Sequence, residues 1–214
     1  MQTYKQQFIQ FAIDAGALRF GTFTLKSGRT SPYFFNAGLF NSGSRLKKLG
    51  QFYAHALQDA DLEYDMLFGP AYKGIPLACA IAIALADGDA RDVPFAFNRK
   101  EIKDHGEGGQ IVGADLAGKV LIVDDVITAG TSVNESVTLI KNAKATPCGV
   151  LIALDRQEIT NTGKPALHEI QEHYQIPVIA IATMDDVMAF LEKNSAFSKE
   201  LPAIIEYRRQ FAKG

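Results

Sequence analysis

The 214-residue chain has no tryptophan and only two cysteines. It also has no charge-free apolar stretch of about 18 residues, the length of a membrane-spanning helix. Cys79 and Cys148 both lie in apolar runs, so we expect two buried thiols in a reducing compartment rather than a disulfide. Asp14 interrupts the first apolar segment, and we therefore expect a soluble, cytoplasmic chain without a cleaved leader.

An excess of either charge is also missing, since 22 Lys and Arg face 24 Asp and Glu, for a net charge of −2. This balance argues against general affinity for nucleic acid or for a membrane surface, although a small site can still be locally basic. A hydrophobic content of 47% over this length is enough for one full core. We expect a single domain over residues 1–214.

Two suggestive patterns lack the spacing that their chemistry needs. His168 and His173 are five residues apart, whereas the two histidines of a zinc-protease helix are four apart and share a face. Asp185 and Asp186 form an acidic pair, but Thr183 and Asp186 fit a capping box at the start of a helix. Neither pattern predicts a functional site.

From residue 45 onward, apolar strands alternate with amphipathic helices. We predict strands over 66–69, 95–98, 120–123, 149–154 and 178–181, and helices over 46–60, 75–86, 133–142, 167–174 and 187–192. This alternation is typical of an α/β fold with a mainly parallel central sheet flanked by helices on both faces. Ligands of such sheets bind at the carboxyl ends of the strands.

Residues 1–40 form a different pattern, with a helix over 1–15 and short strands over 20–26 and 33–36. We expect a small N-terminal lobe there. A final amphipathic helix over 201–211 is expected to pack against the body of the domain.

Residues 99–118 stand out as a long segment without periodicity, since connections of about 20 residues are rare inside a compact domain. Its first half carries the cations Arg99, Lys100, Lys103 and His105, and glycines follow. A basic cluster beside glycine hinges favours a lid that closes over an anion and excludes water. A solvated loop is the alternative, because three acidic residues offset the positive charge.

The most informative stretch is residues 120–132, VLIVDDVITAGTS. A buried strand leads into Asp124 and Asp125, and a turn of small and hydroxyl residues then opens a helix near Val133. Backbone N–H groups and the helix dipole converge there, so the turn favours an anion such as a phosphate. It is not a Walker loop, because no Lys follows Gly130. Either one acid caps the turn and the other is solvated, or the acids face ribose hydroxyls or hydrated Mg²⁺.

This stretch closely resembles the phosphoribosyl-diphosphate signature of the type I phosphoribosyltransferases. Residues 23–38, 68–76, 97–109 and 154–158 resemble the branch of that family whose acceptor is orotate. The resemblance implies the type I phosphoribosyltransferase fold with a small N-terminal lobe and a long mobile catalytic loop over 99–118. It also implies transfer of ribose 5-phosphate from phosphoribosyl diphosphate to orotate, in pyrimidine synthesis.

The resemblance carries functional residues onto matching positions. The catalytic residues implied are Lys103, His105, Asp124 and Asp125. Those implied for phosphoribosyl diphosphate are Lys26, Tyr72, Lys73, Arg99, Lys100, Lys103, His105, Asp124, Asp125, Val126, Ile127, Thr128, Ala129, Gly130, Thr131 and Ser132. Those implied for orotate are Lys26, Phe34, Phe35, Thr128 and Arg156. Taken alone, Phe34 and Phe35 look like one core and one rim aromatic, and Arg156 like a surface residue.

The family resemblance further implies Mg²⁺ as cofactor, held mainly by substrate oxygens and water rather than by protein ligands. It implies a homodimer in which the basic loop of one subunit reaches the site of its neighbour, and no nucleic-acid or membrane partner. Two rivals stay open: a purine or uracil phosphoribosyltransferase, whose base has no carboxylate, and a regulator that senses phosphoribosyl diphosphate without catalysis.

Overall fold

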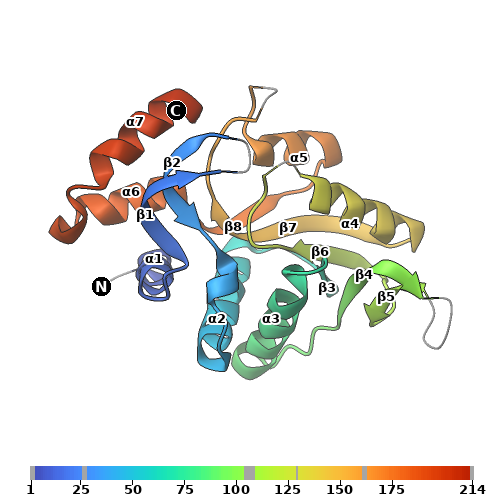
Figure 1. The fold of residues 1–214 in the computed structure, drawn as a ribbon. Helices are drawn as coiled ribbons and strands as arrows, with labels where there is room; N and C mark the ends of the chain where they lie inside the picture. Colours follow the sequence, from blue (N-terminus) through green and yellow to red (C-terminus); the bar gives the residue numbers. More distant parts are fainter. Residues whose placement is uncertain (1–2, 26–27, 104–108, 129, 161–162, 213–214) are drawn as a thin grey trace.

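The computed structural model describes residues 3–25, 28–103, 109–128, 130–160 and 163–212. Its centre is a six-stranded sheet in the order β5-β4-β3-β6-β7-β8 (Figure 1). The strands are β3 (Met66–Gly69), β4 (Phe95–Lys103), β5 (Gly109–Gly113), β6 (Lys119–Val123), β7 (Thr146–Asp155) and β8 (Val178–Thr183). Neighbouring strands are parallel except for β4 and β5, which are antiparallel.

Helices cover both faces of this sheet, because successive residues of each parallel strand point to opposite sides. In β6, Leu121 and Val123 belong to one buried cluster, and Val120 and Ile122 to the other. The first cluster lies under α1 (Tyr4–Asp14), α2 (Gly43–Ala60) and α3 (Gly74–Asp89), and the second under α4 (Thr131–Asn142) and α5 (Ala166–Tyr174). The predicted α/β architecture is confirmed.

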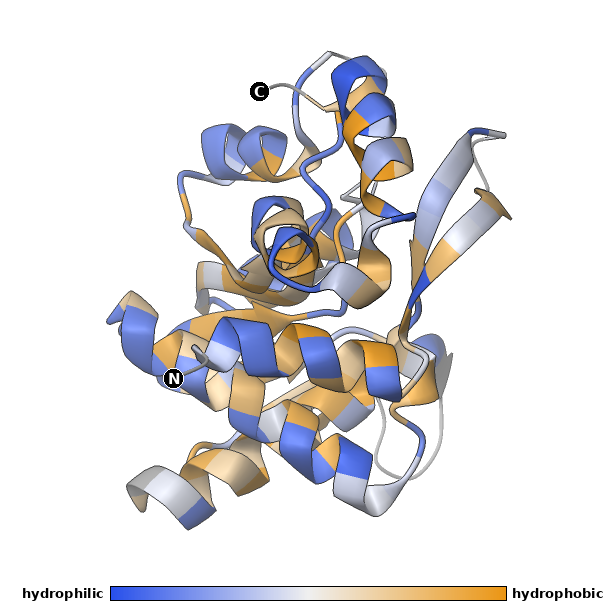
Figure 2. Cartoon of the chain, turned by 90° about the vertical axis from the view of Figure 1, so that its left-hand side faces the viewer, coloured by the Kyte–Doolittle hydropathy of each residue, from blue (hydrophilic) through white to orange (hydrophobic). Residues whose placement is uncertain are grey.

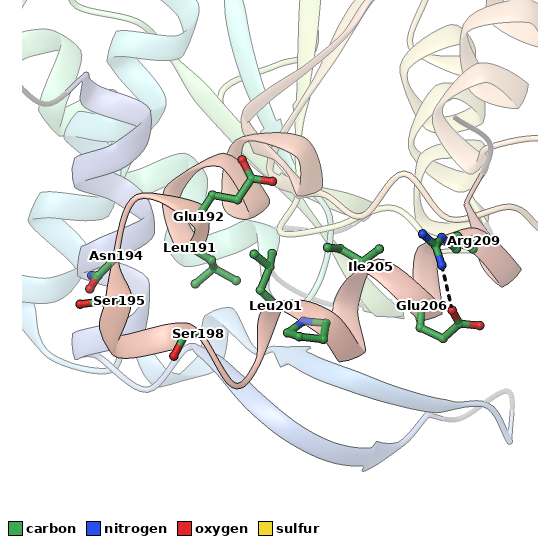
Figure 3. A pocket seen from close by; sticks show the side chains of 10 residues that line it. Leu191, Glu192, Asn194, Ser195, Ser198, Leu201, Ile205, Glu206 and Arg209 are labelled. Atoms are coloured by element: carbon green, nitrogen blue, oxygen red, sulfur yellow. Dashed lines mark hydrogen bonds and ion pairs between the residues drawn. The ribbon is translucent and has the colours of Figure 1, made fainter.

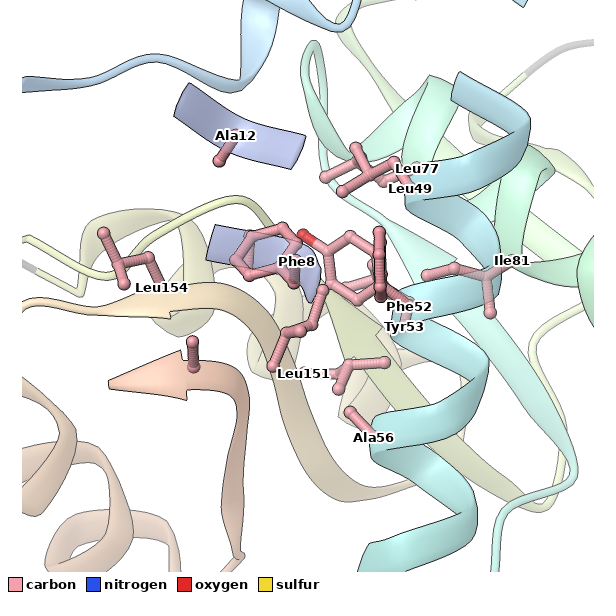
Figure 4. Packing of buried hydrophobic residues seen from close by; sticks show 14 of the residues in the cluster. Phe8, Ala12, Leu49, Phe52, Tyr53, Ala56, Leu77, Ile81, Leu151 and Leu154 are labelled. Carbon is pink, nitrogen blue, oxygen red and sulfur yellow. The ribbon is translucent and has the colours of Figure 1, made fainter. Parts of the chain in front are cut away.

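Large side chains fill the first cluster. Phe8 of α1, Tyr53 of α2 and Leu151 of β7 pack together there, each at most 1% exposed (Figure 4). Most helices carry both hydrophilic and hydrophobic residues around their circumference (Figure 2), whereas α3 has no charged residue over 74–86. Cys79 and Cys148 are both free and only half-buried, less buried than we expected. Within the described residues, no helix is both long enough and apolar enough to cross a bilayer.

The N-terminal lobe is an antiparallel hairpin of β1 (Leu18–Thr24) and β2 (Thr30–Phe35) outside the main sheet. The C-terminal helices α6 (Met184–Glu192) and α7 (Leu201–Phe211) lie on the same side of the molecule as this hairpin (Figure 1). Tyr207 of α7 meets Tyr33 of β2 edge to face, with ring centroids 6.0 Å apart. The last helix therefore packs on the N-terminal hairpin, which brings the two ends of the chain into one region.

The segment 99–118 differs from the expectation of an aperiodic loop. β4 continues past the predicted end at Asn98 to Lys103, and β5 pairs with it from Gly109, with a register irregularity between Asn98 and Lys103. This end of β4 shows no apolar alternation, because past Phe97 it extends beyond its pairing with β3 and lies against the edge strand β5. The connection 104–108, which contains His105, lies outside the described residues.

Candidate active site

The carboxyl ends of β3 and β6 meet at the point where the strand order reverses. The two strands are parallel neighbours, yet β3 leads into α3 on one face of the sheet and β6 leads into α4 on the other. The two connecting loops therefore diverge and leave a crevice between them. This is the position at which open α/β sheets bind their ligands.

The loop after β3 is tightly built around two glycines. A Cβ on Gly69 would collide with the carbonyl oxygen of Gly74, and one on Gly74 would lie 2.6 Å from Cδ of Pro70 and 2.8 Å from the carbonyl oxygen of Val123. The backbone N–H of Ala71 donates to Oδ1 of the buried Asn98 at 2.8 Å, and the peptide bond between Ala71 and Tyr72 is cis. This loop presents Tyr72 and Lys73 to the crevice.

Asp124 is the better fixed of the two acids after β6. Its Oδ1 accepts from the backbone N–H of Asp125 at 2.8 Å, and its Oδ2 accepts from the hydroxyl of Ser132 at 2.9 Å. The hydroxyl of Tyr53 donates to its carbonyl oxygen at 2.9 Å. Burial, and then the negative charge of Asp125, raise the pKa of Asp124 to about 6. The carboxylate of Asp124 is therefore ionised only at a cost.

Asp125 points to the neighbouring loop instead. Its Oδ2 lies 2.5 Å from Nζ of Lys73, whose side chain is 54% exposed while that of Asp125 is 7% exposed. One acid thus caps its own turn, as the simpler interpretation expects, but the other is neither solvated nor free. The ion pair joins the loops after β3 and β6 across the crevice.

The turn before α4 has the geometry of an anion site. Gly130 is the N-cap of α4 with φ of +71°, and no described side chain caps the helix. Val126 packs against the core cluster on one face of the sheet and Ile127 belongs to the cluster on the other, so the turn is anchored on both sides. No described side chain caps the N–H groups in the first turn of α4, which begins at Thr131. Uncapped N–H groups at a helix start are what a bound phosphate needs.

Other predicted residues around this turn have different outcomes. Thr128 and Thr131 are exposed, whereas the hydroxyl of Ser132 is bonded to Asp124. Lys100 of β4 lies with its Nζ 5.1 Å from the ring centroid of Tyr72, so these two come together. Arg99 precedes Lys100 in β4 and is half-buried. The structure does not fully describe four of the predicted residues. Lys26, His105 and Ala129 lie outside the described residues, and of Lys103 only the backbone is described.

The residues predicted for the base come from separate elements. Phe34 stacks on Phe23 in the hairpin, with centroids 5.6 Å apart, whereas Phe35 packs against the main core. Successive residues of β2 face opposite ways, so the two rings do not line one pocket with their faces. Arg156 follows β7 and is partly buried, with its side chain 17% exposed, so it is not the surface residue that the sequence taken alone suggests.

Arg156 has two partners that the sequence did not single out, Glu158 and Tyr33. Both occur in segments that resemble the family. Glu158 lies only two residues after Arg156, whereas Tyr33 is 123 residues away, and a contact over that separation leaves no local pattern. A pocket of about 390 Å³ between α6 and α7, lined by Leu191, Leu201 and Ile205 among others, includes none of the predicted site residues (Figure 3).

Comparison with known proteins agrees with this geometry. Residues 39–162 match the family model described as the phosphoribosyl transferase domain. The chain is 57% identical over 211 residues to an orotate phosphoribosyltransferase of Thiobacillus denitrificans, covering 99% of each protein, and 58% identical to that of Methylococcus capsulatus with the same coverage. A crystal structure of the Francisella tularensis orotate phosphoribosyltransferase superposes with a TM-score of 0.88 at 42% identity, over 97% of this chain and 100% of that one.

The chain therefore belongs to the phosphoribosyltransferase family, and within it to the orotate phosphoribosyltransferases.

Proposed function

We propose that this protein transfers ribose 5-phosphate from 5-phospho-α-D-ribose 1-diphosphate to orotate, giving orotidine 5′-phosphate and diphosphate in pyrimidine nucleotide synthesis. One observation carries the proposal: two buried acids at the tip of β6, one of them paired to Lys73 of the adjacent loop, stand before an uncapped helix start. A sugar with a phosphate at one end and hydroxyls beside it fits this arrangement.

The reaction breaks the bond between the anomeric carbon and the diphosphate, so positive charge develops on the sugar and negative charge on the leaving group. We place the 5-phosphate at the N–H groups of residues 128–132. Asp124 and Asp125 then face the ribose hydroxyls and stabilise the developing positive charge. Asp125 gives up its contact with Lys73 when substrate enters, which frees the ammonium group for the departing diphosphate.

The chain's residues fit a hydrated Mg²⁺ that is bound largely by substrate. Mg²⁺ prefers oxygen ligands, keeps several waters and commonly uses one or two carboxylates together with substrate phosphates. The crevice offers two adjacent carboxylates, and among the described residues no cluster of three or more acids, histidines or cysteines could hold a metal. When bound, the ion would neutralise diphosphate charge. Asp125, which lacks the two hydrogen bonds of Asp124, is the better candidate to face it.

The remaining cations act on the leaving group in this proposal. Tyr72 and Lys73 bind diphosphate from the loop after β3, and Lys100 lies beside Tyr72. Arg99, Lys103 and His105 complete the set from the β4–β5 arm and its connection. Closure of this arm over the crevice would exclude water from a carbon that otherwise hydrolyses.

The homodimer is part of the proposal, and α3 supplies its support. Residues 74–86 contain no charged residue, and a helix that is apolar all round is normally covered. Yet Ile83 is 59% exposed and Pro76 is exposed in the single chain, and Tyr72 beyond the helix start is 69% exposed. An uncharged stripe can meet a second copy of itself without like-charge repulsion, and this contact would bring the partner beside the diphosphate loop.

The dimer proposal is tested by changing one exposed side chain. Ile83→Glu introduces a charge that would face its own copy, so we expect monomers by light scattering after size exclusion at micromolar concentration. Glu192→Gln, on the exposed surface of α6, is the control. A dimer of unchanged mass in Ile83→Glu would show that another surface is used.

The activity is tested by following the absorbance of orotate on addition of phosphoribosyl diphosphate, with Mg²⁺ and with a chelator. We expect loss of orotate only with Mg²⁺, and no reaction with uracil, which lacks the carboxylate. Arg156→Ala should then lower kcat/KM for orotate by roughly a hundredfold, the value of a charged hydrogen-bonded pair. Equal turnover of orotate and uracil would contradict the proposed acceptor, and with it the cytoplasmic pyrimidine pathway that we propose as the setting.

A further inference from the structure

Arg156 is held by a partly buried acid, Glu158. Its Nη2 donates to Oε1 of Glu158 at 2.6 Å, and the two side chains are only 17% and 15% exposed. Buried ion pairs are costly unless their geometry is good and their remaining polar atoms are satisfied. A pair this short and this enclosed fixes the guanidinium plane as well as its charge.

Tyr33 completes the arrangement from the N-terminal hairpin. Its ring is 1% exposed, and its hydroxyl donates to the same Oε1 of Glu158 at 2.6 Å. Nε of Arg156 donates to that hydroxyl at 3.4 Å, and the guanidinium carbon lies 5.3 Å from the centroid of the Tyr33 ring. One tyrosine thus contacts both members of the ion pair.

The three residues are locked together by the C-terminal helix. Tyr207 packs edge to face on Tyr33, the backbone N–H of Ile159 donates to the carbonyl oxygen of Phe211 at 2.8 Å, and Glu158 forms a backbone bridge with Ala212. The position of Arg156 therefore depends on β2, on the segment after β7 and on α7. Two of these lie outside residues 39–162, which match the general family model.

The electrostatics of the guanidinium agree with this geometry. Burial lowers the pKa of Arg156, but Tyr33 and Glu158 raise it, and the net shift is upward. Nε and Nη2 are engaged, while Nη1 makes no hydrogen bond to any described residue. The guanidinium thus keeps one edge for an incoming carboxylate.

We propose that Tyr33 and Glu158 are positioning residues that hold Arg156 in the orientation that receives the orotate carboxylate, so that they set the KM for orotate and not the handling of phosphoribosyl diphosphate. This inference rests on the proposed function. Neither residue was among those carried over from the family resemblance.

The opposite role predicts the opposite sign. If Glu158 only offset the positive charge of Arg156, its neutralisation to glutamine would leave a stronger cation and would lower the KM for orotate. If Glu158 positions the guanidinium, Glu158→Gln weakens the charged hydrogen bond and frees the side chain to move. The KM for orotate then rises.

The experiment measures kcat and both KM values for the wild-type enzyme and six variants, after thermal melting has verified folding. We expect Glu158→Gln to raise the KM for orotate roughly tenfold, as loss of a charged hydrogen bond does, and Tyr33→Phe about fivefold. The KM for phosphoribosyl diphosphate should stay within twofold. The double variant should fall short of the product of the two effects, because both residues act on one group.

Matched controls separate positioning from general damage. Tyr4→Phe removes a tyrosine hydroxyl at the start of α1, where the ring stacks on His55, and Glu206→Gln neutralises an exposed acid of α7 that pairs with Arg209. Both should leave the KM for orotate unchanged. An effect in Tyr4→Phe equal to that in Tyr33→Phe would reduce the loss in Tyr33→Phe to general damage.

The outcomes distinguish this inference from the proposed function. If the wild-type enzyme consumes orotate and Arg156→Lys raises its KM, but Glu158→Gln does not raise it, the positioning role is wrong and the function stands. If Arg156→Lys has no effect either, the carboxylate binds elsewhere and the inference fails at its base. If the wild-type enzyme does not consume orotate, both fail together.

Discussion

The two halves of the site are built in different ways. The half assigned to phosphoribosyl diphosphate comes from two short loops at the tips of neighbouring strands, and its glycines, backbone amides and acids are close in sequence. The half assigned to the base joins β2, the end of β7 and α7 through side chains. Residues 39–162, which match the family model, contain both of these loops and omit β1, β2 and α7.

This difference teaches where specificity can change. A phosphate held by backbone at a strand tip depends on the path of the chain, and most side-chain substitutions nearby leave that path intact. A base held by a network of side chains from three distant segments changes with any of them. The following variants test whether the half assigned to phosphoribosyl diphosphate depends on local chain geometry and on a few positions that do not tolerate substitution.

The largest effect is expected for Asp125→Asn. Its carboxylate is the acid that faces across the crevice, so the variant should lose roughly a hundredfold to a thousandfold in kcat, the range for removal of one well-placed electrostatic group. Steady-state assays at saturating substrate measure this loss, with Asp14→Asn on the exposed end of α1 as control. If Asp125→Asn keeps wild-type kcat, the acid pair serves only the turn.

Lys103→Ala should lower kcat by about a hundredfold while the folded state is unaffected, because the charge matters mostly as diphosphate departs. Lys119→Ala is the matched control at the opposite, amino-terminal end of the sheet, where Lys119 pairs with Glu63. Circular dichroism melting verifies folding in both. Unchanged turnover in Lys103→Ala would remove the β4–β5 arm from the mechanism.

The sequence predicted the first half because its signals are local. Buried strand, acid pair and small-residue turn follow one another within residues 120–132, and α4 begins at Thr131, only two residues before the predicted start. The parallel strands were predicted to within a few residues for the same reason. Hydrophobic runs and glycines indicate the local structure of each segment without information about its partners in the fold.

The sequence did not predict what depends on distant partners. It did not indicate that Lys73 would pair with Asp125, that Tyr33 and Glu158 would enclose Arg156, or that β4 would extend along β5. Glu158 lies only two residues after Arg156, but an Arg and a Glu at this spacing also occur together on surfaces, and Tyr33, 123 residues away from Arg156, joins them only in the folded chain. The polar end of β4 likewise resembles a loop in sequence, because no apolar alternation marks it. The cytoplasmic location stays a prediction.

Glycine substitutions sharpen the comparison at the level of stability. Gly74→Ala places a methyl group against Pro70 and the backbone of Gly69 and Val123, and should cost about 3 kcal/mol, the upper range for overpacking. Gly88→Ala, in the same helix with open space around it, should instead stabilise by about 0.5 kcal/mol. Urea unfolding measures both. Equal stabilities would mean that the loop after β3 can relax.

The smallest expected effect is a pH-dependent difference in the free energy of unfolding between variants of Asp124 and Asp125. The pKa of Asp124 is raised to about 6 in the folded protein, whereas an unfolded aspartate titrates near its usual, lower value. The protonated form is therefore favoured by folding, so the stability that it contributes is complete at low pH and is lost as the pH rises through about 6. An amide at this position cannot ionise, and Asp124→Asn should therefore stabilise the protein by roughly 2 kcal/mol at pH 7.5.

Near pH 4 the same variant should match the wild type, because both side chains are then neutral. Asp125→Asn should give no gain at pH 7.5, since it loses the ion pair with Lys73. Urea unfolding at four pH values between 4 and 7.5 measures the difference. If Asp124→Asn gains nothing at pH 7.5, burial does not penalise that carboxylate. If both variants gain equally, Asp124 and Asp125 do not have the different roles proposed for them.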